Sequence, residues 1–185
     1  MASEVRTNKV SPATGTALQI ADSGDTITVP SGATLAVASG ATISNAGTQS
    51  GFGKVLQVVQ GTYATQTSTT GTTYVTSNLS ASITPSSTSN KVLVLVHINS
   101  FYVTGTPAGA HLALYRGGSP IVDVADSIYS QANHISAAGV ITHLDSPSST
   151  SSLSYEVYFK KSTGGTAFVH DSNRQSNIVL LEIEG

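Results

Sequence analysis

The sequence predicts an all-β protein, in which a short octad-repeat shaft near the N-terminus is followed by a jelly-roll-like β-sandwich head. Two observations predict this class. An eight-residue unit occurs three times between Gly24 and Gly47, and from Lys54 onward short apolar runs alternate with turn residues. No stretch of the head keeps a helical period. We therefore expect three parts: an N-terminal segment at residues 1–20, the shaft at 21–53 and the head at 54–185.

The N-terminal segment holds two short apolar patches, residues 5–10 and 17–20, on either side of a Ser-Pro-Ala-Thr-Gly turn signal. Two of the eight basic residues of the chain lie in it. Two interpretations stay open: a frayed terminus, or a segment that becomes ordered when it docks on another protein. In the second interpretation the docking residues are Val5, Arg6, Lys9 and Val10.

The octad units read GDTITVPS, GATLAVAS and GATISNAG. Each unit predicts a short strand closed by a turn of Pro, Ser, Asn and Gly residues. One unit cannot bury its apolar side chains alone, and three units are too few for a self-sufficient solenoid. We therefore expect the apolar stripe to meet the same stripe of other chains in a homotrimeric shaft. The alternative is a Gly/Ser/Thr/Ala-rich linker with accidental periodicity. The expected trimer contacts are Ile27, Val29, Leu35, Val37 and Ile43.

The head is predicted to contain many short strands, which is typical of a sandwich or barrel. In the run at 153–160 apolar and polar residues alternate, so one face of this strand is expected to be buried. The expected strands are residues 55–60, 72–76, 79–83, 92–103, 111–116, 140–144, 153–160, 166–170 and 178–183.

Two of these runs, residues 92–98 and 178–183, are apolar on both faces. In an antiparallel domain without helices, a second apolar face needs a cover. We expect that cover to be another subunit, because the shaft already requires several chains. The alternative is that both runs are central strands of a sandwich whose outer face is covered by a long loop.

Composition excludes several classes of function. Charged residues make up 10% of the chain and the net charge is −2, which gives no electrostatic case for binding nucleic acid or an anionic membrane. There is no cysteine, so a disulfide framework and a zinc–thiolate site are excluded. No apolar run approaches the length of a membrane span, and no signal-peptide core follows Met1. Synthesis in a cytoplasm, without membrane insertion, is therefore expected.

No catalytic site and no cofactor are expected. The five histidines stand singly, but in a threefold assembly one histidine per chain can meet on the axis and bind a metal, for which His97 is the candidate. A histidine without metal is the simpler expectation. No Gly-x-Ser-x-Gly motif occurs. Asp123 and Asp126 are close in sequence, as a glycosidase acid pair requires, but solvated carboxylates on a predicted loop are the simpler interpretation.

Two predicted loops, residues 126–134 and 170–175, carry aromatic, amide and charged groups in place of Ser and Thr. A sugar needs a flat apolar ring to lie on and planar hydrogen-bonding groups around it. These loops are therefore candidates for receptor binding, and the alternative is that both are ordinary polar connections. The candidate residues are Tyr129, Gln131, Asn133, Asn173, Arg174 and Gln175.

Several motifs along the chain point together to a known family. They are residues 4–12, 24–33 and 53–59, and the closing elements 144–147, 155–157 and 178–183. On these motifs the chain resembles small tail-fibre or related virion proteins of tailed bacteriophages, particularly those that infect marine bacteria and cyanobacteria. The resemblance covers nearly the whole chain, and its N-terminal and octad motifs are the more specific part.

The resemblance implies a homotrimeric fibre in the virion, made in the host cytoplasm. Its N-terminus attaches to other tail or capsid proteins, and its head contacts a glycan or protein of the host surface. Three octads are few for a fibre, which leaves open a minor tail appendage or a capsid decoration protein. A glycan-degrading tailspike usually requires a long β-solenoid that carries an acid pair, and this chain has neither the length nor the spacing for it. A lectin or C1q/TNF-like trimer is disfavoured by the missing cysteines and signal peptide.

Overall fold

The computed structural model describes residues 26–34, 36–41, 55–171 and 174–185. The chain divides into two units, Met1–Gln49 and Ser50–Gly185, and each is described by itself. In the described ranges there is no helix, and hence none that could cross a membrane. Several predicted residues lie outside the described ranges: Val5, Arg6, Lys9, Val10, Leu35, Ile43 and Asn173.

In the octad repeat, the period of the sequence is also a period of backbone structure. Residues 30–33 and 38–41 each form a turn, closed by a 3.0 Å hydrogen bond from the backbone N–H of the fourth residue to the carbonyl oxygen of the first. The third residue of each turn is a glycine, Gly32 with φ 81° and Gly40 with φ 84°. A type II turn requires a positive φ at this place, which glycine adopts without steric cost. The glycine period therefore has a structural cause.

The described part of the repeat, residues 26–34 and 36–41, holds no strand, contrary to the prediction of one strand per unit. A strand needs a second strand for its hydrogen bonds, and no described segment pairs with these residues. Their apolar side chains remain open to solvent: Ile27 is 63% exposed, Val29 46% and Val37 44%. These are the surfaces that the predicted shaft would cover with other chains.

The described part of the second unit contains ten strands and is all-β, as predicted. They are β1 (Val55–Tyr63), β2 (Thr67–Thr69), β3 (Val75–Ile83), β4 (Lys91–Thr104), β5 (Ala108–Arg116), β6 (Ser119–Ser130), β7 (His134–Asp145), β8 (Leu153–Thr163), β9 (Thr166–Val169) and β10 (Ser176–Ile183).

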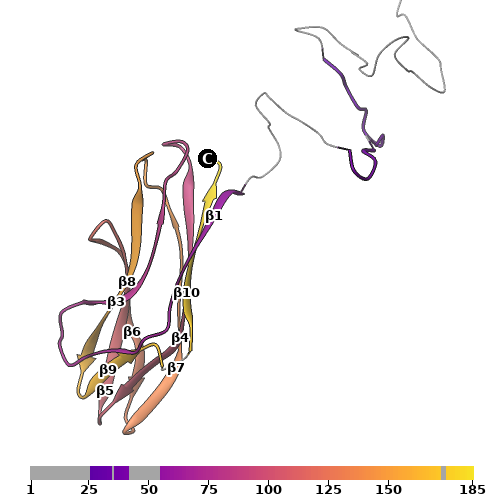
Figure 1. Cartoon of the computed structure of the whole chain (residues 1–185). Helices are drawn as coiled ribbons and strands as arrows, with labels where there is room; N and C mark the ends of the chain where they lie inside the picture. Colours follow the sequence, from indigo (N-terminus) through magenta and orange to yellow (C-terminus); the bar gives the residue numbers. More distant parts are fainter. Residues whose placement is uncertain (1–25, 35, 42–54, 172–173) are drawn as a thin grey trace, which may run out of the picture. The chain divides into compact units, whose positions relative to one another are not determined.

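These strands form two antiparallel sheets that face each other (Figure 1). The four-stranded sheet has the order β3-β8-β5-β6. The six-stranded sheet has the order β1-β10-β4-β9-β2, with β7 on the other side of β4. The long strand β4 organises this sheet, because β7 pairs with both of its halves, whereas β10 and β9 share its opposite edge.

The core lies between the two sheets and follows the predicted alternation. In β8 the inward side chains of Tyr155, Val157 and Phe159 are fully buried, which confirms the half-buried strand expected at 153–160. β4 and β10 contribute their inward apolar residues in the same way. The largest fully buried apolar side chains are Tyr155, Phe101, Phe159, Leu79, Ile83, Ile98, Leu112, Leu114, Ile178 and Leu180.

Strand β6 was not predicted, and it corrects the interpretation of the acidic stretch. Asp123 and Asp126 lie on this strand and not on a loop. Its alternation is irregular, because the pairing of β5 with β6 shifts register twice and Asp126 has a φ of 46°. Such bulges hide the two-residue period that a strand prediction depends on. The short strand β2 was also missed.

A buried carboxylate ties the two sheets together. Asp145, at the end of β7 in the six-stranded sheet, accepts hydrogen bonds from Arg116 Nη1 at 2.5 Å and from Tyr155 Oη at 2.6 Å. Arg116 and Tyr155 belong to β5 and β8 of the four-stranded sheet. Burial, together with the bond to Asp145, raises the pKa of Tyr155, so its hydroxyl stays a donor at neutral pH.

A second carboxylate, Glu182 on β10, is 1% exposed and is held by donors from three parts of the chain. It accepts hydrogen bonds from Gln57 Nε2 at 2.6 Å, from Asn90 Nδ2 at 2.5 Å, and from the backbone N–H and hydroxyl of Ser86 at 2.6 and 2.8 Å. Burial alone raises the pKa of Glu182, but these hydrogen bonds outweigh it and lower the pKa to about 2.

We expect Glu182→Gln to lower the free energy of unfolding at pH 7 by about 2–3 kcal/mol, because hydrogen bonds to charged groups are worth about 1.5–3 kcal/mol. The depressed pKa means that this stability is present above the pKa of the unfolded state and is lost as pH falls from about 5 toward 2. Urea unfolding at pH 7 and pH 3 measures both effects. Asp171→Asn is the control, since that carboxylate is 47% exposed. An unchanged pH dependence in Glu182→Gln would contradict this assignment.

Candidate ligand-binding face

The outer face of the four-stranded sheet carries three half-buried tyrosines, here called the tyrosine cluster. Tyr74 precedes β3, Tyr115 lies on β5 and Tyr158 lies on β8. The rings of Tyr115 and Tyr158 stack with their centroids 4.1 Å apart, and Tyr74 meets Tyr115 edge-on at 6.0 Å. Their strand neighbours Leu114 and Phe159 are in the core, so the alternation of the strands directs these rings outward.

Charged side chains surround the tyrosine cluster. The Lys160 ammonium lies 4.4 Å from the centre of the Tyr74 ring, a cation–π contact. The Tyr74 hydroxyl donates to Asp123 Oδ1, and the Tyr158 hydroxyl donates to Glu156 Oε2 at 3.1 Å. The face therefore combines flat apolar rings with charged hydrogen-bonding groups.

Burial, and then a neighbouring carboxylate, disfavours ionisation of two of these phenols. Burial, and then the hydrogen bond to Asp123, raises the pKa of Tyr74 above its ordinary value. Burial, and then Glu156, raises the pKa of Tyr158 in the same direction. A negative neighbour disfavours the phenolate, so both hydroxyls remain donors through the physiological range.

Beside the tyrosine cluster lies a cleft with a volume of about 530 Å³, which is in the range of small-ligand sites. Lys160 lines the cleft and also contacts the Tyr74 ring of the tyrosine cluster. The cleft is lined by Thr72, His111, Asp126, Tyr129, Lys160, Lys161, Ser162 and Thr163.

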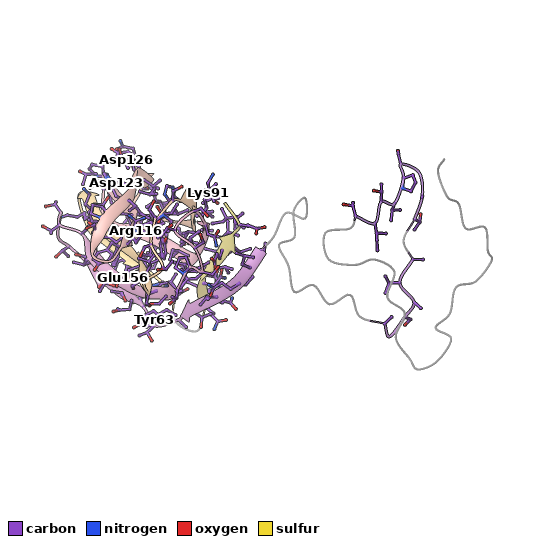
Figure 2. All side chains as sticks on the ribbon, turned by 90° about the horizontal axis from the view of Figure 1, so that it is seen from above. Tyr63, Lys91, Arg116, Asp123, Asp126 and Glu156 are labelled. Atoms are coloured by element: carbon purple, nitrogen blue, oxygen red, sulfur yellow. The ribbon has the colours of Figure 1, made fainter. Side chains whose placement is uncertain are left out.

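His111 on β5 lies between two carboxylates of β6. Its Nε2 is 3.4 Å from Asp126 Oδ1, and its Nδ1 is 3.7 Å from Asp123 Oδ1. The bulge in the β5–β6 pairing allows this arrangement, because Asp123 and Asp126 are three residues apart and yet reach the same ring. Figure 2 labels both carboxylates on the same side of the head.

Of the residues predicted to bind a receptor, Tyr129 lies on β6, is 45% exposed and lines the cleft. Gln131 is next to it and donates from Nε2 to the Tyr129 hydroxyl oxygen at 2.9 Å. Asn133 lies in the connection from β6 to β7, where its carbonyl oxygen accepts from Gly105 N at 3.0 Å. The structure thus brings Tyr129 and Gln131 together at the edge of the cleft.

Arg174 and Gln175 lie instead in the connection from β9 to β10 of the six-stranded sheet. Arg174 Nε is 3.8 Å from Asp171 Oδ2, and the Gln175 carbonyl oxygen accepts from Asn99 Nδ2 at 3.4 Å. Among the described residues, no hydrogen bond or ion pair joins this connection to Tyr129 or Gln131.

The six-stranded sheet carries its own aromatic group. Tyr102 stacks on Phe168 with a centroid distance of 4.5 Å and an interplanar angle of 4°, and its ring centre is 5.3 Å from that of His134. Gln66 Nε2 donates to the Tyr102 hydroxyl oxygen at 2.8 Å. This group joins β4, β9 and β7, which are distant in sequence.

Sequence reasoning missed the tyrosine cluster. The alternation of each strand contained a signal for it. Tyr158 lies on the same outward face of β8 as Glu156 and Lys160. Tyr115 lies on the same face of β5 as His111. An aromatic residue among outward polar residues is a binding-site signal. What the sequence did not show is that β5 and β8 are neighbours.

The outer face of the six-stranded sheet is apolar, and this surface is here called the apolar outer face. Val58, Leu181, Leu93 and Leu144 stand opposite one another on β1, β10, β4 and β7. Val58 is 60% exposed and Leu144 is 51% exposed. The two-sided apolar character predicted for residues 92–98 and 178–183 is confirmed. Both runs are central strands of the six-stranded sheet, as the alternative interpretation expected, and no described loop covers their outer face.

His97, the candidate for an axial metal, lies on the apolar outer face opposite Val140 and is exposed. Within the described part of a single chain, no group of three or more His, Asp or Glu side chains is placed to hold a metal ion. A site that requires one histidine from each of three chains stays a prediction.

No family model matches the chain, and no curated protein matches it. The solved structures to which it is similar include dimeric latent PorU from Porphyromonas gingivalis, at 10% identity and a TM-score of 0.40, covering 69% of this chain and 13% of that one. A T13 viral particle of infectious bursal disease virus (IBDV) follows at 13% identity and a TM-score of 0.38, covering 69% of this chain and 37% of that one. The structure of the Gx strain of that virus has 18% identity and a TM-score of 0.36, and the match covers 70% of this chain and 32% of that one.

The chain spans only 13% to 37% of the length of these three proteins. At TM-scores below 0.5, these similarities carry no argument about the fold or the function of this chain. The candidate sites therefore depend on the chain's own geometry.

An alkaline titration followed by tyrosinate absorbance at about 295 nm tests the raised pKa of Tyr74. We expect the Tyr74→Phe variant to match the unchanged chain below about pH 10 and to show less absorbance above it, because the raised pKa delays ionisation of this phenol. The same titration in about 6 M urea is the control, since unfolding removes the contact with Asp123. A loss of amplitude below pH 10 in the folded variant would show that Tyr74 is not shielded as described.

Proposed function

We propose that this chain is a non-enzymatic structural protein of a virus particle, a homotrimeric tail fibre of a tailed bacteriophage. Its N-terminal segment attaches to other virion proteins, and its head contacts the host surface. The observation that carries the trimer is the apolar outer face, which the described residues of one chain leave open. The virion location is proposed from the sequence motifs at residues 4–12, 24–33 and 53–59.

The apolar outer face supports association with identical chains. Contiguous exposed apolar surface marks interaction sites in soluble proteins. Most soluble oligomers are built from identical chains with closed symmetry. The octad repeat also exposes the apolar side chains of Ile27, Val29 and Val37, which supports the same association between identical chains.

We further infer that the head sandwich is a jelly roll. Without the short strands β2 and β9, the two sheets have the orders β1-β10-β4-β7 and β3-β8-β5-β6. Eight antiparallel strands in two facing sheets are the strand complement of a jelly roll. This architecture supports a structural role, and it presents two outer faces of different chemistry to the surroundings.

Sedimentation of the purified chain tests the trimer. We expect a trimer at micromolar concentration, and a shift to monomer when Leu93→Asp and Leu181→Asp are combined, because buried unpaired carboxylates are costly. Ser82→Asp is the matched control, since Ser82 is exposed on β3 of the other sheet. A compact, stable monomer of the unchanged chain would overturn the homotrimer.

Deletion of residues 1–20 tests the attachment segment. We expect the truncated chain to remain a folded trimer, because no described strand of the head includes these residues. It should no longer enter the virus particle when it replaces the full chain during assembly. Normal incorporation of the truncated chain would place the attachment elsewhere.

Electron microscopy of purified virus particles, labelled with an antibody against this chain, tests the location. We expect label on the tail. Label over the capsid would contradict the tail fibre and favour a capsid decoration protein. Unlabelled particles would overturn the proposed location in the virion.

A further inference from the structure

We propose that the cleft beside the tyrosine cluster binds an acidic saccharide, a sugar chain that carries carboxylate or sulfate groups. The biological role of this site rests on the proposed contact between head and host surface. The chemistry of the ligand follows from the cleft alone.

The shape and lining of the cleft suit a sugar. Its volume of about 530 Å³ is large enough for a short oligosaccharide. The half-exposed ring of Tyr129 offers a flat apolar surface for the face of a sugar ring. Thr72 and Thr163 add hydroxyl groups that can exchange hydrogen bonds with sugar hydroxyls.

The charge of the cleft selects an anion. Lys160 and Lys161 both line it, and neither forms an ion pair with a described carboxylate. The Lys160 ammonium contacts the Tyr74 ring at 4.4 Å. Lys161 uses its backbone N–H to bond Gly71 O at 3.0 Å, and its ammonium has no hydrogen bond or ion pair within the described residues. Two cations without a carboxylate partner favour a negatively charged ligand.

The nearby carboxylates do not neutralise these lysines, because both face His111. Asp126 lies 3.4 Å from His111 Nε2, and Asp123 lies 3.7 Å from Nδ1 while it accepts from the Tyr74 hydroxyl. Asp126 is the single carboxylate among the cleft-lining residues. Its negative charge repels an anionic ligand. Substitution of Asp126 should therefore raise the affinity for that ligand, whereas substitution of a lysine should lower it.

Unused hydrogen-bonding capacity lies in the wall of the same cleft. Buried polar atoms nearly always have a partner. In the described part of the chain, two buried side-chain atoms have none, and they are His111 Nδ1 and Ser162 Oγ. Both residues line the cleft. Both atoms are closed to solvent, so they do not contact a ligand directly, but they show that the wall of the cleft is polar and incompletely hydrogen-bonded.

A saccharide fits this cleft better than a nucleic acid does. Nucleic-acid binding depends on several phosphate contacts, whereas the cleft offers two lysines in a chain with a net charge of −2. Inorganic phosphate alone would use the lysines but would leave the Tyr129 ring and the hydroxyl groups without a role.

The proposal is tested by probing an array of oligosaccharides with the full chain. The array holds oligosaccharides that carry uronate, sialate or sulfate groups, together with matched neutral ones. Calorimetry then measures the affinity of the ligand that binds most tightly. We expect binding to acidic members only. Lys161→Met should weaken it by about tenfold through loss of a charge-assisted contact, and Asp126→Asn should tighten it by a few-fold. Tyr129→Ala should also weaken it.

Lys91→Met is the matched control, because Lys91 is an exposed lysine at the start of β4 and Figure 2 shows it away from Asp126. Its affinity should equal that of the unchanged chain. Absence of binding to every acidic member, equal binding of neutral and acidic members, or binding of inorganic phosphate alone would overturn the proposal. None of these results bears on the trimer or the virion location, which sedimentation and particle labelling measure separately.

Discussion

The two-sided apolar character of β4 and β10 is the constraint on which the rest of the head depends. Their inward side chains, such as Val94 and Leu180, form the centre of the core. Their outward side chains, such as Leu93 and Leu181, form the apolar outer face with β1 and β7. The hydrophobic effect buries the inward side chains within one chain. Burial of the outward side chains requires an additional surface.

Charged residues are few in this chain, so the places where they occur indicate which sites use them. The chain has 18 charged residues among 185, from 8 Lys and Arg plus 10 Asp and Glu. Asp145 and Glu182 are buried, and each accepts hydrogen bonds from residues distant in the sequence. Asp123, Asp126 and Lys160 gather instead on the outer face of the four-stranded sheet. That concentration supports recognition on this face.

The head therefore has two outer faces with different chemistry. The six-stranded sheet presents aliphatic side chains in register across four strands, a surface suited to packing against a copy of itself. The four-stranded sheet presents tyrosines, lysines and carboxylates around a cleft, a surface suited to a polar ligand. In the proposed trimer, self-association on one face leaves the other free for the proposed ligand.

The sequence by itself determined what depends on local periodicity. The glycines of the octads predicted turns every eight residues, because Gly32 and Gly40 must adopt a positive φ. The alternation at 153–160 and the two-sided apolar runs predicted which side chains are buried, since parity along a strand is a local property. Only the tertiary structure decided which strands are neighbours. The tyrosine cluster and the donors around Glu182 join residues far apart in the chain, and the bulges in the β5–β6 pairing hid the period of β6. Pairing across long sequence distances depends on packing of the whole sandwich, which no short stretch of sequence encodes.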